Sequence, residues 1–506
     1  MKTFKNLKYL GLIALAISFT ACNDEEDFEQ FLDEPPMEAV TLPALNAGSA
    51  DFSNYIAVGA SFTAGFTDGG LFKAGQEDSF VNTIAKQFAN VGGGTFIQPL
   101  TADNFGGLAL GGNRIQGPRL VFGGAGPVPL ESIIGPVTVG TDLLAPPSGP
   151  FNNFGVPGAK SFHLIAPGYG NLANFPAAAN PYAVRLTGTT PDASIVQLAV
   201  NEGPTFFTLS EIGGNDVLGY ATTGGDGTDP ITPTTTFDFA LDAMVNALTT
   251  NPNTKGAIGN VPNITSLAHF TTVPHNPIPL DAATAGAVNS AYAAYNAGVQ
   301  SLVGIPPVNL TQAEADSRMI SFAAVENNAV VILDENLSDL TIYNAALVPM
   351  RQATSADLFV LPASSFIGTL AVPGNPLTVN GVAVPLADKW VLTPQEQLEI
   401  ADATAAYNNS IASIASSKGL AFVDLNTILA QAASTGIVFD DYNMDTRLVF
   451  GGLISLDGIH LTARGSAIMA NSFLDAIDTT YGSNFRASGN VAKADDFGVT
   501  YSPLLQ

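Results

Sequence analysis

The chain has 506 residues, of which 46% are hydrophobic and 12% charged, and its formal net charge is −26. This composition argues against the disordered class, which combines low hydrophobicity with high charge. A net negative charge of this size repels phosphate groups, so we expect no nucleic-acid partner. The single cysteine, Cys22, rules out an intramolecular disulfide.

The N-terminus predicts an exported lipoprotein. Three lysines precede an apolar stretch at residues 9–19, which is the order expected of a signal peptide, here residues 1–21. The stretch ends in FTAC at residues 19–22, which resembles a bacterial lipobox, although Phe19 replaces the commoner leucine. This resemblance implies that Cys22 becomes the lipidated first residue of the mature protein. The alternative is an ordinary secreted chain with an incidental cysteine.

The residues after Cys22 predict a flexible tether over residues 22–50. The acidic run NDEED at residues 23–27 resembles the export signal of surface lipoproteins in Bacteroidetes-type bacteria, and its alternative reading is simply a solvated linker. No later apolar stretch approaches the ~20 residues that a membrane helix needs. We therefore expect a lipid-anchored protein of the bacterial outer membrane, exposed at the cell surface, whose only membrane contact is its anchor.

Short apolar runs alternate with helical patterns between residues 51 and 485. The runs lie at residues 55–58, 205–209, 257–261 and 420–423, and the helical patterns at residues 239–248, 287–302, 394–416 and 463–477. This alternation predicts an α/β fold, with three α/β/α layers around a mainly parallel sheet. Residues 68–150 and 270–385, rich in Gly, Pro, Asn and Thr, are predicted insertions in this domain, and residues 486–506 a C-terminal tail.

Four segments place reactive or hydrogen-bonding groups where strands end. They are GASFTAG at 59–65 with Ser61, NFGVPGA at 153–159 with Gly158, EIGGND at 211–216 with Asn215, and SLDGIHLT at 455–462. In the last segment Asp457 stands three residues before His460, so the two side chains can meet in one turn and Asp457 can select the histidine tautomer. A nucleophile, a base, an orienting carboxylate and oxyanion donors are together what acyl transfer requires. Each segment alone also fits an ordinary glycine turn.

In this order the four segments resemble the conserved blocks of the SGNH (GDSL-like) hydrolases, which are named for Ser, Gly, Asn and His. The resemblance implies a flavodoxin-like fold and a carboxylic ester hydrolase that uses no cofactor. It implies that Ser61 attacks the ester carbonyl while His460 takes its proton and Asp457 orients His460. The oxyanion would be bound by the backbone N–H groups of Ser61 and Gly158 and by the Asn215 amide.

The chain departs from the family pattern at two points. Many members have Asp before the serine, where this chain has Ala60, which leaves open how the turn is held. The spacings are also long, with 158 − 61 = 97 residues between Ser61 and Gly158 and 457 − 215 = 242 between Asn215 and Asp457. We therefore expect the insertions to build the substrate pocket.

Other chemically capable residues are assigned structural roles. His163, His269 and His275 have no carboxylate or histidine partner at metal-ligand spacing, so no metal is implied. Trp390 is read as a core residue rather than a carbohydrate platform.

Two non-enzymatic readings compete with the hydrolase. One is a catalytically idle SGNH-fold surface lipoprotein that binds glycan or lipid, because a fold does not dictate an activity. The other is a lipoprotein partner of an outer-membrane transporter. The presence of Ser, Gly, Asn, Asp and His at all the expected places favours the enzyme. Its substrate is left open among a lipid ester, an acetylated glycan and a small ester, and so is its class among esterase, lipase and glycan deacetylase.

Overall fold

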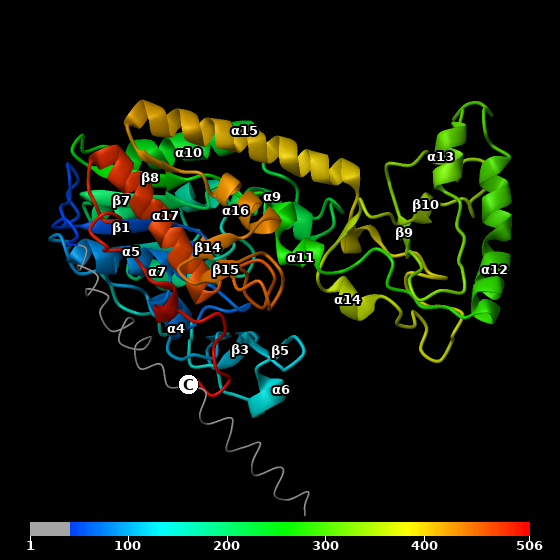
Figure 1. Ribbon diagram of the computed structural model, residues 1–506, viewed down its shortest axis with the longest axis horizontal. Helices are drawn as coiled ribbons and strands as arrows, with labels where there is room; N and C mark the ends of the chain where they lie inside the picture. Colours follow the sequence, from blue (N-terminus) through cyan, green and yellow to red (C-terminus); the bar gives the residue numbers. More distant parts are fainter. Residues whose placement is uncertain (1–40, 506) are drawn as a thin grey trace, which may run out of the picture. The chain divides into compact units, whose positions relative to one another are not determined.

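A computed structural model, drawn in Figure 1, describes residues 41–505. The chain divides after Ala44 into two units, and the description that follows concerns the second, which begins at Leu45. The predicted signal peptide, Cys22 and the acidic run lie outside the described residues.

The central sheet consists of five short strands that are all parallel to their neighbours. They are β1 (Tyr55–Gly59), β6 (Asn153–Gly155), β7 (Phe206–Ser210), β8 (Lys255–Gly259) and β13 (Ala421–Val423), in the order β13-β8-β7-β1-β6. Numbered along the chain, this is the order 2-1-3-4-5 of flavodoxin-like, doubly wound folds. The predicted α/β class with a parallel sheet is confirmed.

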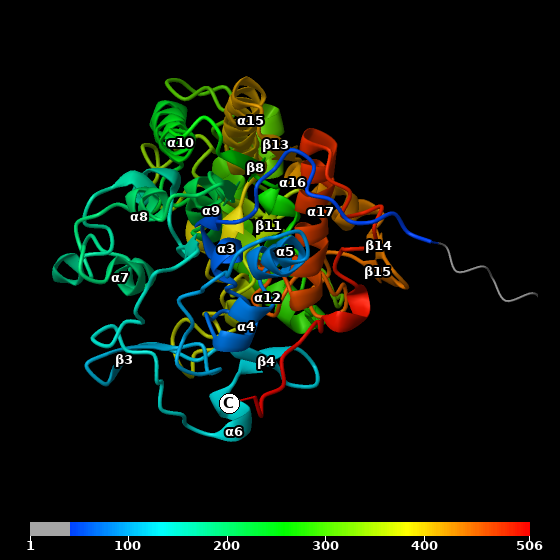
Figure 2. The same cartoon turned by 90° about the vertical axis from the view of Figure 1, so that its left-hand side faces the viewer.

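Helices cover both faces of the sheet, and the alternation of side chains along β1 shows why. Tyr55 and Ala57 are buried in one apolar cluster with α5 (Phe80–Ala89) and α17 (Ala463–Tyr481). Ile56 and Val58 point to the opposite face and join a second cluster with α8 (Ile195–Asn201), α10 (Thr234–Leu248) and α15 (Pro394–Lys418). Figure 2 shows α8, α10 and α15 on one side of the sheet and α5 and α17 on the other. The result is a three-layer core.

The predicted helices form, and their ends follow capping chemistry. The Thr462 hydroxyl accepts a hydrogen bond from the Gly465 amide at 3.0 Å, as expected of the residue that begins α17. Helix α15 begins with Thr393 and Glu396 in a reciprocal capping box and with Pro394 in its first turn, so it starts where the sequence predicts. The pattern predicted at residues 287–302 overlaps α12 (Ala282–Gln300), which begins five residues earlier and ends two residues earlier.

The remaining elements are short, and they connect the core elements or lie around them. The helices are α3 (Ser61–Ala64), α4 (Lys73–Glu77), α6 (Glu131–Ile134), α7 (Pro181–Thr187), α9 (Gly214–Thr222), α11 (Ala268–Thr271), α13 (Gln312–Ser317), α14 (Ala363–Phe366) and α16 (Leu425–Ser434). Short 3-10 helices are η1 (Ser161–Ile165), η2 (Leu172–Asn174), η3 (Ile264–Ser266), η4 (Asp388–Trp390) and η5 (Ala494–Asp496). Antiparallel pairs join β2 (Leu108–Leu110) with β3 (Asn113–Gln116), β4 (Leu120–Phe122) with β5 (Pro127–Pro129), β9 (Val331–Leu333) with β10 (Met350–Gln352), β11 (Leu358–Phe359) with β12 (Val391–Leu392), and β14 (Ile437–Phe439) with β15 (Tyr442–Met444).

The two predicted insertions differ in their relation to the core. The range 68–150 includes α5, whose Phe80 ring packs against Phe473 of α17 with centroids 5.2 Å apart, so part of it belongs to a layer of the fold. The range 270–385 holds α12, α13 and the β9–β10 pair, which Figure 1 shows grouped together. The second insertion therefore forms structure of its own.

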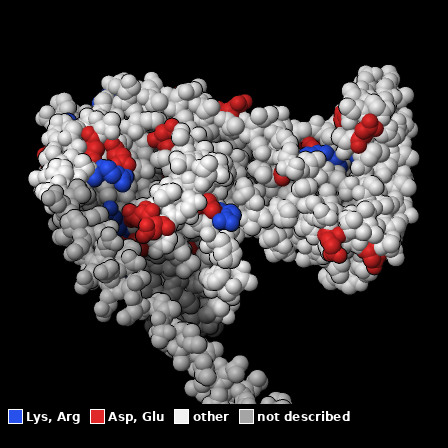
Figure 3. All heavy atoms as spheres, in the orientation of Figure 1, with Lys and Arg blue, Asp and Glu red and all other residues white. Residues whose placement is uncertain are grey.

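Charge is sparse on the surface, as the composition requires. Most of the face drawn in Figure 3 carries neither acidic nor basic side chains. Among residues 41–505, no helix is long and apolar enough to cross a membrane.

Candidate active site

The topology of the sheet brings three of the four motif segments to one edge. Strand order reverses at β1, which has β6 on one side and β7 on the other. In doubly wound sheets, ligands bind beyond the carboxyl ends of the strands at such a switch point. Ser61 directly follows β1, Gly158 follows β6, and Asn215 follows β7. The order of strands, rather than proximity in the chain, therefore assembles the candidate site.

Ser61 occupies a tight turn between β1 and the short helix α3. The preceding Ala60 has φ −108° and ψ −129°, outside the helical and extended regions, and Gly65 ends the turn with φ 81°. Ser61 is 8% exposed and lines a pocket. Within residues 41–505, neither its hydroxyl nor its backbone N–H forms a hydrogen bond. Both groups are thus available to a ligand.

The Glu211 carboxylate holds this turn through hydrogen bonds to its backbone. Its Oε2 accepts from the Phe62 amide at 2.6 Å, and its Oε1 accepts from the Thr63 amide at 2.7 Å. Burial raises the pKa of Glu211 to about 7, although these hydrogen bonds and the nearby His460 act in the opposite direction. A carboxyl from the end of β7 therefore holds the turn that follows Ala60.

Asp457 and His460 meet within one turn, as the spacing predicts. Asp457 Oδ2 lies 2.8 Å from His460 Nδ1, and Asp457 Oδ1 accepts from the His460 and Ile459 amides, each at 2.9 Å. Burial disfavours the ionised form of Asp457, but His460 and these hydrogen bonds outweigh it and hold its pKa well below the usual range. An ionised Asp457 on Nδ1 favours the tautomer in which Nε2 is the accepting nitrogen.

A second layer of hydrogen bonds fixes Asp457. The Gly69 amide donates to its Oδ2 at 2.8 Å, and the Ser455 hydroxyl lies 3.1 Å from its Oδ1. Asp68 accepts from the Leu456 amide at 3.0 Å, and burial, with Asp457 adding to it, raises the pKa of Asp68 to about 7. Asp68 and Gly69 come from the beginning of the predicted insertion at residues 68–150, so this insertion contributes to the site.

The turn that carries Ser61 lies against the histidine ring. The rings of Phe62 and Phe66 have centroids 5.8 Å and 4.7 Å from that of His460. Within residues 41–505, no hydrogen bond joins Ser61 to His460. Catalytic hydrogen bonds are often long before substrate binds, so a nucleophile and its base need not be bonded in the free protein.

Asn215 and Gly158 are linked through one loop. Asn215 lies in the first turn of α9, and its Nδ2 donates to the carbonyl of Ala159, the residue after Gly158, at 2.9 Å. This bond uses one of the two amide hydrogens of Asn215, which leaves the other for a ligand. Gly158 is exposed with φ 78°, and within the described residues its N–H forms no hydrogen bond. Each of the three proposed oxyanion donors thus keeps one N–H hydrogen that no described residue accepts.

Asp216 anchors the same loop from the other side. Its carboxylate accepts from the Ser161 amide at 2.8 Å and from the Ser161 hydroxyl at 2.7 Å, and its side chain is fully buried. Both Asn215 and Asp216 therefore position the segment that bears Gly158.

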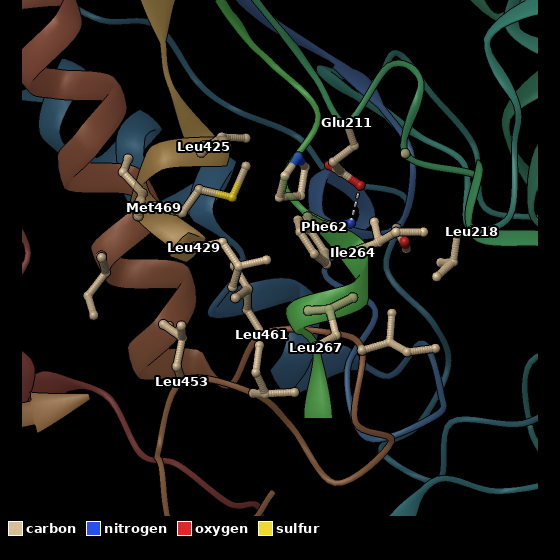
Figure 4. A pocket seen from close by; sticks show the side chains of 18 of the residues that line it. Phe62, Glu211, Leu218, Ile264, Leu267, Leu425, Leu429, Leu453, Leu461 and Met469 are labelled. Carbon is tan, nitrogen blue, oxygen red and sulfur yellow. Dashed lines mark hydrogen bonds between the residues drawn. The ribbon is translucent and has the colours of Figure 1, made fainter. Parts of the chain in front are cut away.

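An apolar pocket opens beside Ser61. Besides Ser61, Asn215 and Glu211, it is lined mainly by aliphatic side chains, namely Leu218, Ile264, Leu267, Leu425, Ile428, Leu429, Leu453, Ile454, Ile459, Leu461, Ile468 and Met469. In Figure 4, Leu425, Leu453 and Met469 lie on one side of Phe62 and Leu218 on the other. The lining comes mainly from α9, η3, α16, α17 and the segment around His460. It includes no residue of 68–150 or 270–385, so the expectation that the insertions build the substrate pocket is wrong for this pocket. No sequence motif signals it, because its residues are scattered over most of the chain.

Three of the residues that the sequence assigns to structural roles form hydrogen bonds or ring contacts with their neighbours. His163 accepts from the Lys160 amide through Nδ1 at 3.1 Å and stacks on Tyr169 with centroids 4.5 Å apart. His269 is buried, which lowers its pKa, and its amide donates to the Gly458 carbonyl at 2.9 Å. Trp390 stacks on Phe366 with centroids 4.6 Å apart.

Comparison with known proteins finds no match for the chain. No protein-family model matches the chain. No curated protein and no solved structure matches it either.

Proposed function

We propose that this chain is a serine ester hydrolase that cleaves esters of aliphatic acyl chains through an acyl-Ser61 intermediate. One observation carries the proposal: Ser61, beside the paired Asp457 and His460, faces a pocket whose walls are almost entirely aliphatic. The SGNH resemblance of the four segments supports the reaction class. The pocket supports the substrate class, because burying each CH₂ of an acyl chain is favourable by about 0.8 kcal/mol.

In this mechanism, His460 Nε2 takes the proton of the Ser61 hydroxyl as Oγ attacks the ester carbonyl carbon. The negative charge that develops on the carbonyl oxygen is bound by the Ser61 and Gly158 amides and the free Asn215 amide hydrogen. His460 then protonates the departing alkoxide. Water, deprotonated by His460, attacks the acyl-Ser61 carbonyl and releases the carboxylic acid and the free serine.

The aliphatic pocket supports one of the substrate classes that the sequence leaves open. An acetyl group would leave most of the lining in contact with water, and this forfeits the burial that the pocket offers. A glycan deacetylase would also need polar side chains to bind the sugar, whereas the lining contains few. A medium or long acyl chain fits the observed chemistry best.

Hydrolysis of nitrophenyl esters from two to sixteen carbons, beside acetate release from acetylated glycans, tests this proposal. We expect the highest kcat/KM above six to eight carbons, and no hydrolysis by Ser61→Ala with an unchanged Tm. Ser434→Ala, an exposed serine at the end of α16, is the matched control. Highest activity on acetyl esters would identify a deacetylase instead.

A fluorophosphonate probe distinguishes the enzyme from an idle fold that merely binds lipid. We expect the probe to label wild type at Ser61 and to leave Ser61→Ala unlabelled. Lipid binding without labelling or turnover would favour the binding protein.

We also propose that Cys22 carries the lipid anchor and that the hydrolase works at the bacterial surface. The lipobox-like residues 19–22 and the acidic run at residues 23–27 support this localisation.

A further inference from the structure

Three carboxylates that are far apart in the chain converge away from the candidate active site. Glu335 follows β9, Asp388 begins η4, and Glu396 lies in the first turn of α15. One carboxylate oxygen from each lies within 4.8 Å of the corresponding oxygens of the other two. No spacing motif in the sequence signals this cluster, because 396 − 335 = 61 residues separate its ends.

The described part of the chain offers the cluster no cationic partner. Among residues 41–505, no lysine, arginine or histidine forms an ion pair with Glu335, Asp388 or Glu396. The neighbouring Asp334 differs, since its carboxylate is 2.6 Å from the Arg351 guanidinium. Like charges held this close strongly disfavour one another unless a positive charge compensates them.

Two buried oxygens in the cluster lack any hydrogen-bond partner. Glu396 is only 1% exposed; its Oε2 accepts from the Thr393 amide at 2.6 Å, whereas its Oε1 accepts no bond. Asp388 Oδ1 is likewise buried without a partner. Buried, unsatisfied carboxylate oxygens are costly and call for a specific partner.

A glycine pair allows the backbone to approach these oxygens. Gly224 and Gly225, which follow α9, have φ of 66° and 78°. A Cβ on Gly225 would lie 2.1 Å from Glu396 Oε1, and one on Gly224 would lie 2.3 Å from the Asp388 carbonyl oxygen. Neither position can accommodate a side chain, because Gly225 packs against the Glu396 carboxylate and Gly224 against the main chain at Asp388.

We propose that Glu335, Asp388 and Glu396 bind a hard divalent cation, Ca²⁺ in preference to Mg²⁺ or Zn²⁺. All available ligands are oxygens, and they come from a strand end, a 3-10 turn and a helix start rather than from one rigid frame. Ca²⁺ accepts such irregular oxygen sets, Mg²⁺ demands octahedral geometry, and Zn²⁺ prefers nitrogen and sulfur. The cation would neutralise the negative charge of the cluster. Glu396 Oε1, which has no hydrogen-bond partner, would coordinate it.

The site would connect the second insertion to the core. Glu335 belongs to the insertion, Glu396 to the core helix α15, and Gly225 to the loop after α9, the helix that begins beside Asn215. A bound cation would therefore stabilise the insertion on the core, independently of whether Ser61 is catalytic.

Metal binding and melting of the purified full chain test the proposal. After treatment with EDTA, the wild type is equilibrated with Ca²⁺, Mg²⁺ or Zn²⁺ and its bound metal is quantified by mass spectrometry. We expect one Ca²⁺ per chain and a rise in Tm of about 3 °C at saturating Ca²⁺. Glu335→Gln and Asp388→Asn should weaken Ca²⁺ binding at least tenfold. Asp402→Asn, an exposed carboxylate on α15, should leave it unchanged.

The melting temperatures should also change order. In EDTA, Asp388→Asn should melt above wild type because it removes repulsion, whereas in Ca²⁺ it should melt below wild type. The proposal is overturned if wild type binds no Ca²⁺ at millimolar concentration, if the cluster variants bind it as well as wild type, or if Zn²⁺ is retained in preference. Asp388→Asn melting below wild type in both conditions would likewise overturn it.

Discussion

Glu211 and Thr63 are joined by two hydrogen bonds: Glu211 Oε1 accepts from the Thr63 amide at 2.7 Å and from the Thr63 hydroxyl at 2.9 Å. This contact, with the bond to Phe62, connects the end of β7 to the turn after β1. A buried carboxyl thereby positions the proposed nucleophile without being part of the proposed triad.

Glu211→Gln should reduce hydrolysis and remove a component of the pH dependence of stability. Glutamine replaces one accepting oxygen with a donor that faces an amide N–H, so the Ser61 turn should shift and kcat should fall about tenfold or more. The folded chain keeps a proton on Glu211 up to about pH 7, whereas the unfolded chain releases it near 4.5. Protonated Glu211 therefore makes its full contribution to the free energy of unfolding below pH 4.5. This contribution is lost as the pH rises to about 7.

Urea unfolding at several pH values measures the contribution of Glu211 to the free energy of unfolding. Between pH 4.5 and 7.5 the unfolding free energy of wild type should fall, relative to the variant, by roughly 3 kcal/mol, as follows from a pKa of about 7 against 4.5. Glu77→Gln, at an exposed site, is the control and should run parallel to wild type. If Glu211→Gln also runs parallel to wild type, Glu211 does not titrate in this range.

Asp457→Asn should lower kcat by up to about 10⁴ while His460 stays in place, because an amide on Nδ1 no longer selects the tautomer with an accepting Nε2. Steady-state kinetics on the best ester measure the loss. Asp475→Asn, which removes an exposed pair with Arg486, should change kcat little. A loss below tenfold for Asp457→Asn would mean that another group orients His460.

Asn215→Ala should lower kcat by about 10²–10³, or roughly 2.7–4 kcal/mol, with little change in KM, because an oxyanion donor acts mainly in the transition state. The variant also loses the bond to the Ala159 carbonyl, so the Gly158 loop should be less well fixed. Titration with a fluorophosphonate must therefore accompany the kinetics. Normal turnover per titrated serine, with a lowered Tm, would give Asn215 a structural role alone.

Met469→Trp should shorten the preferred acyl chain. Met469 projects from α17 into the aliphatic pocket, and an indole there would occupy space that a long chain needs. We expect kcat/KM for esters of twelve or more carbons to fall at least tenfold relative to butyrate esters. Val438→Trp, at a position 77% exposed, should leave the chain-length profile unchanged. An unaltered profile in Met469→Trp would place the acyl chain elsewhere.

Cys22→Ala should release the protein from membranes and abolish labelling by radioactive fatty acid, since the acyl chains supply the proposed anchor. Fractionation of cells expressing each form measures this. Replacing residues 24–27 with alanine should reduce protease accessibility on whole cells while leaving lipidation intact. Membrane recovery of Cys22→Ala at the wild-type level would exclude lipidation as the tether.

Features that depend on neighbouring residues could be predicted from the sequence. Asp457 and His460 are three residues apart, so one turn suffices to bring Oδ2 within 2.8 Å of Nδ1. The alternation of apolar runs and helical periods indicated a parallel α/β sheet, because each strand must be covered on both faces. Thr462 could likewise be identified as the start of α17, because capping depends on the first turn alone.

The tertiary structure decided what depends on contacts between distant segments. Placing β1 between β6 and β7 brings Ser61, Gly158 and Asn215 to one edge, and no local pattern specifies which strands are neighbours. Glu211 contacts the Ser61 turn although 211 − 61 = 150 residues separate the two in sequence. No local pattern around Ala60 therefore indicated its role. The aliphatic pocket and the three converging carboxylates are assembled in the same way. Their residues are ordinary in sequence, and only packing brings them close enough for hydrophobic and electrostatic interactions, which fall off with distance, to act together.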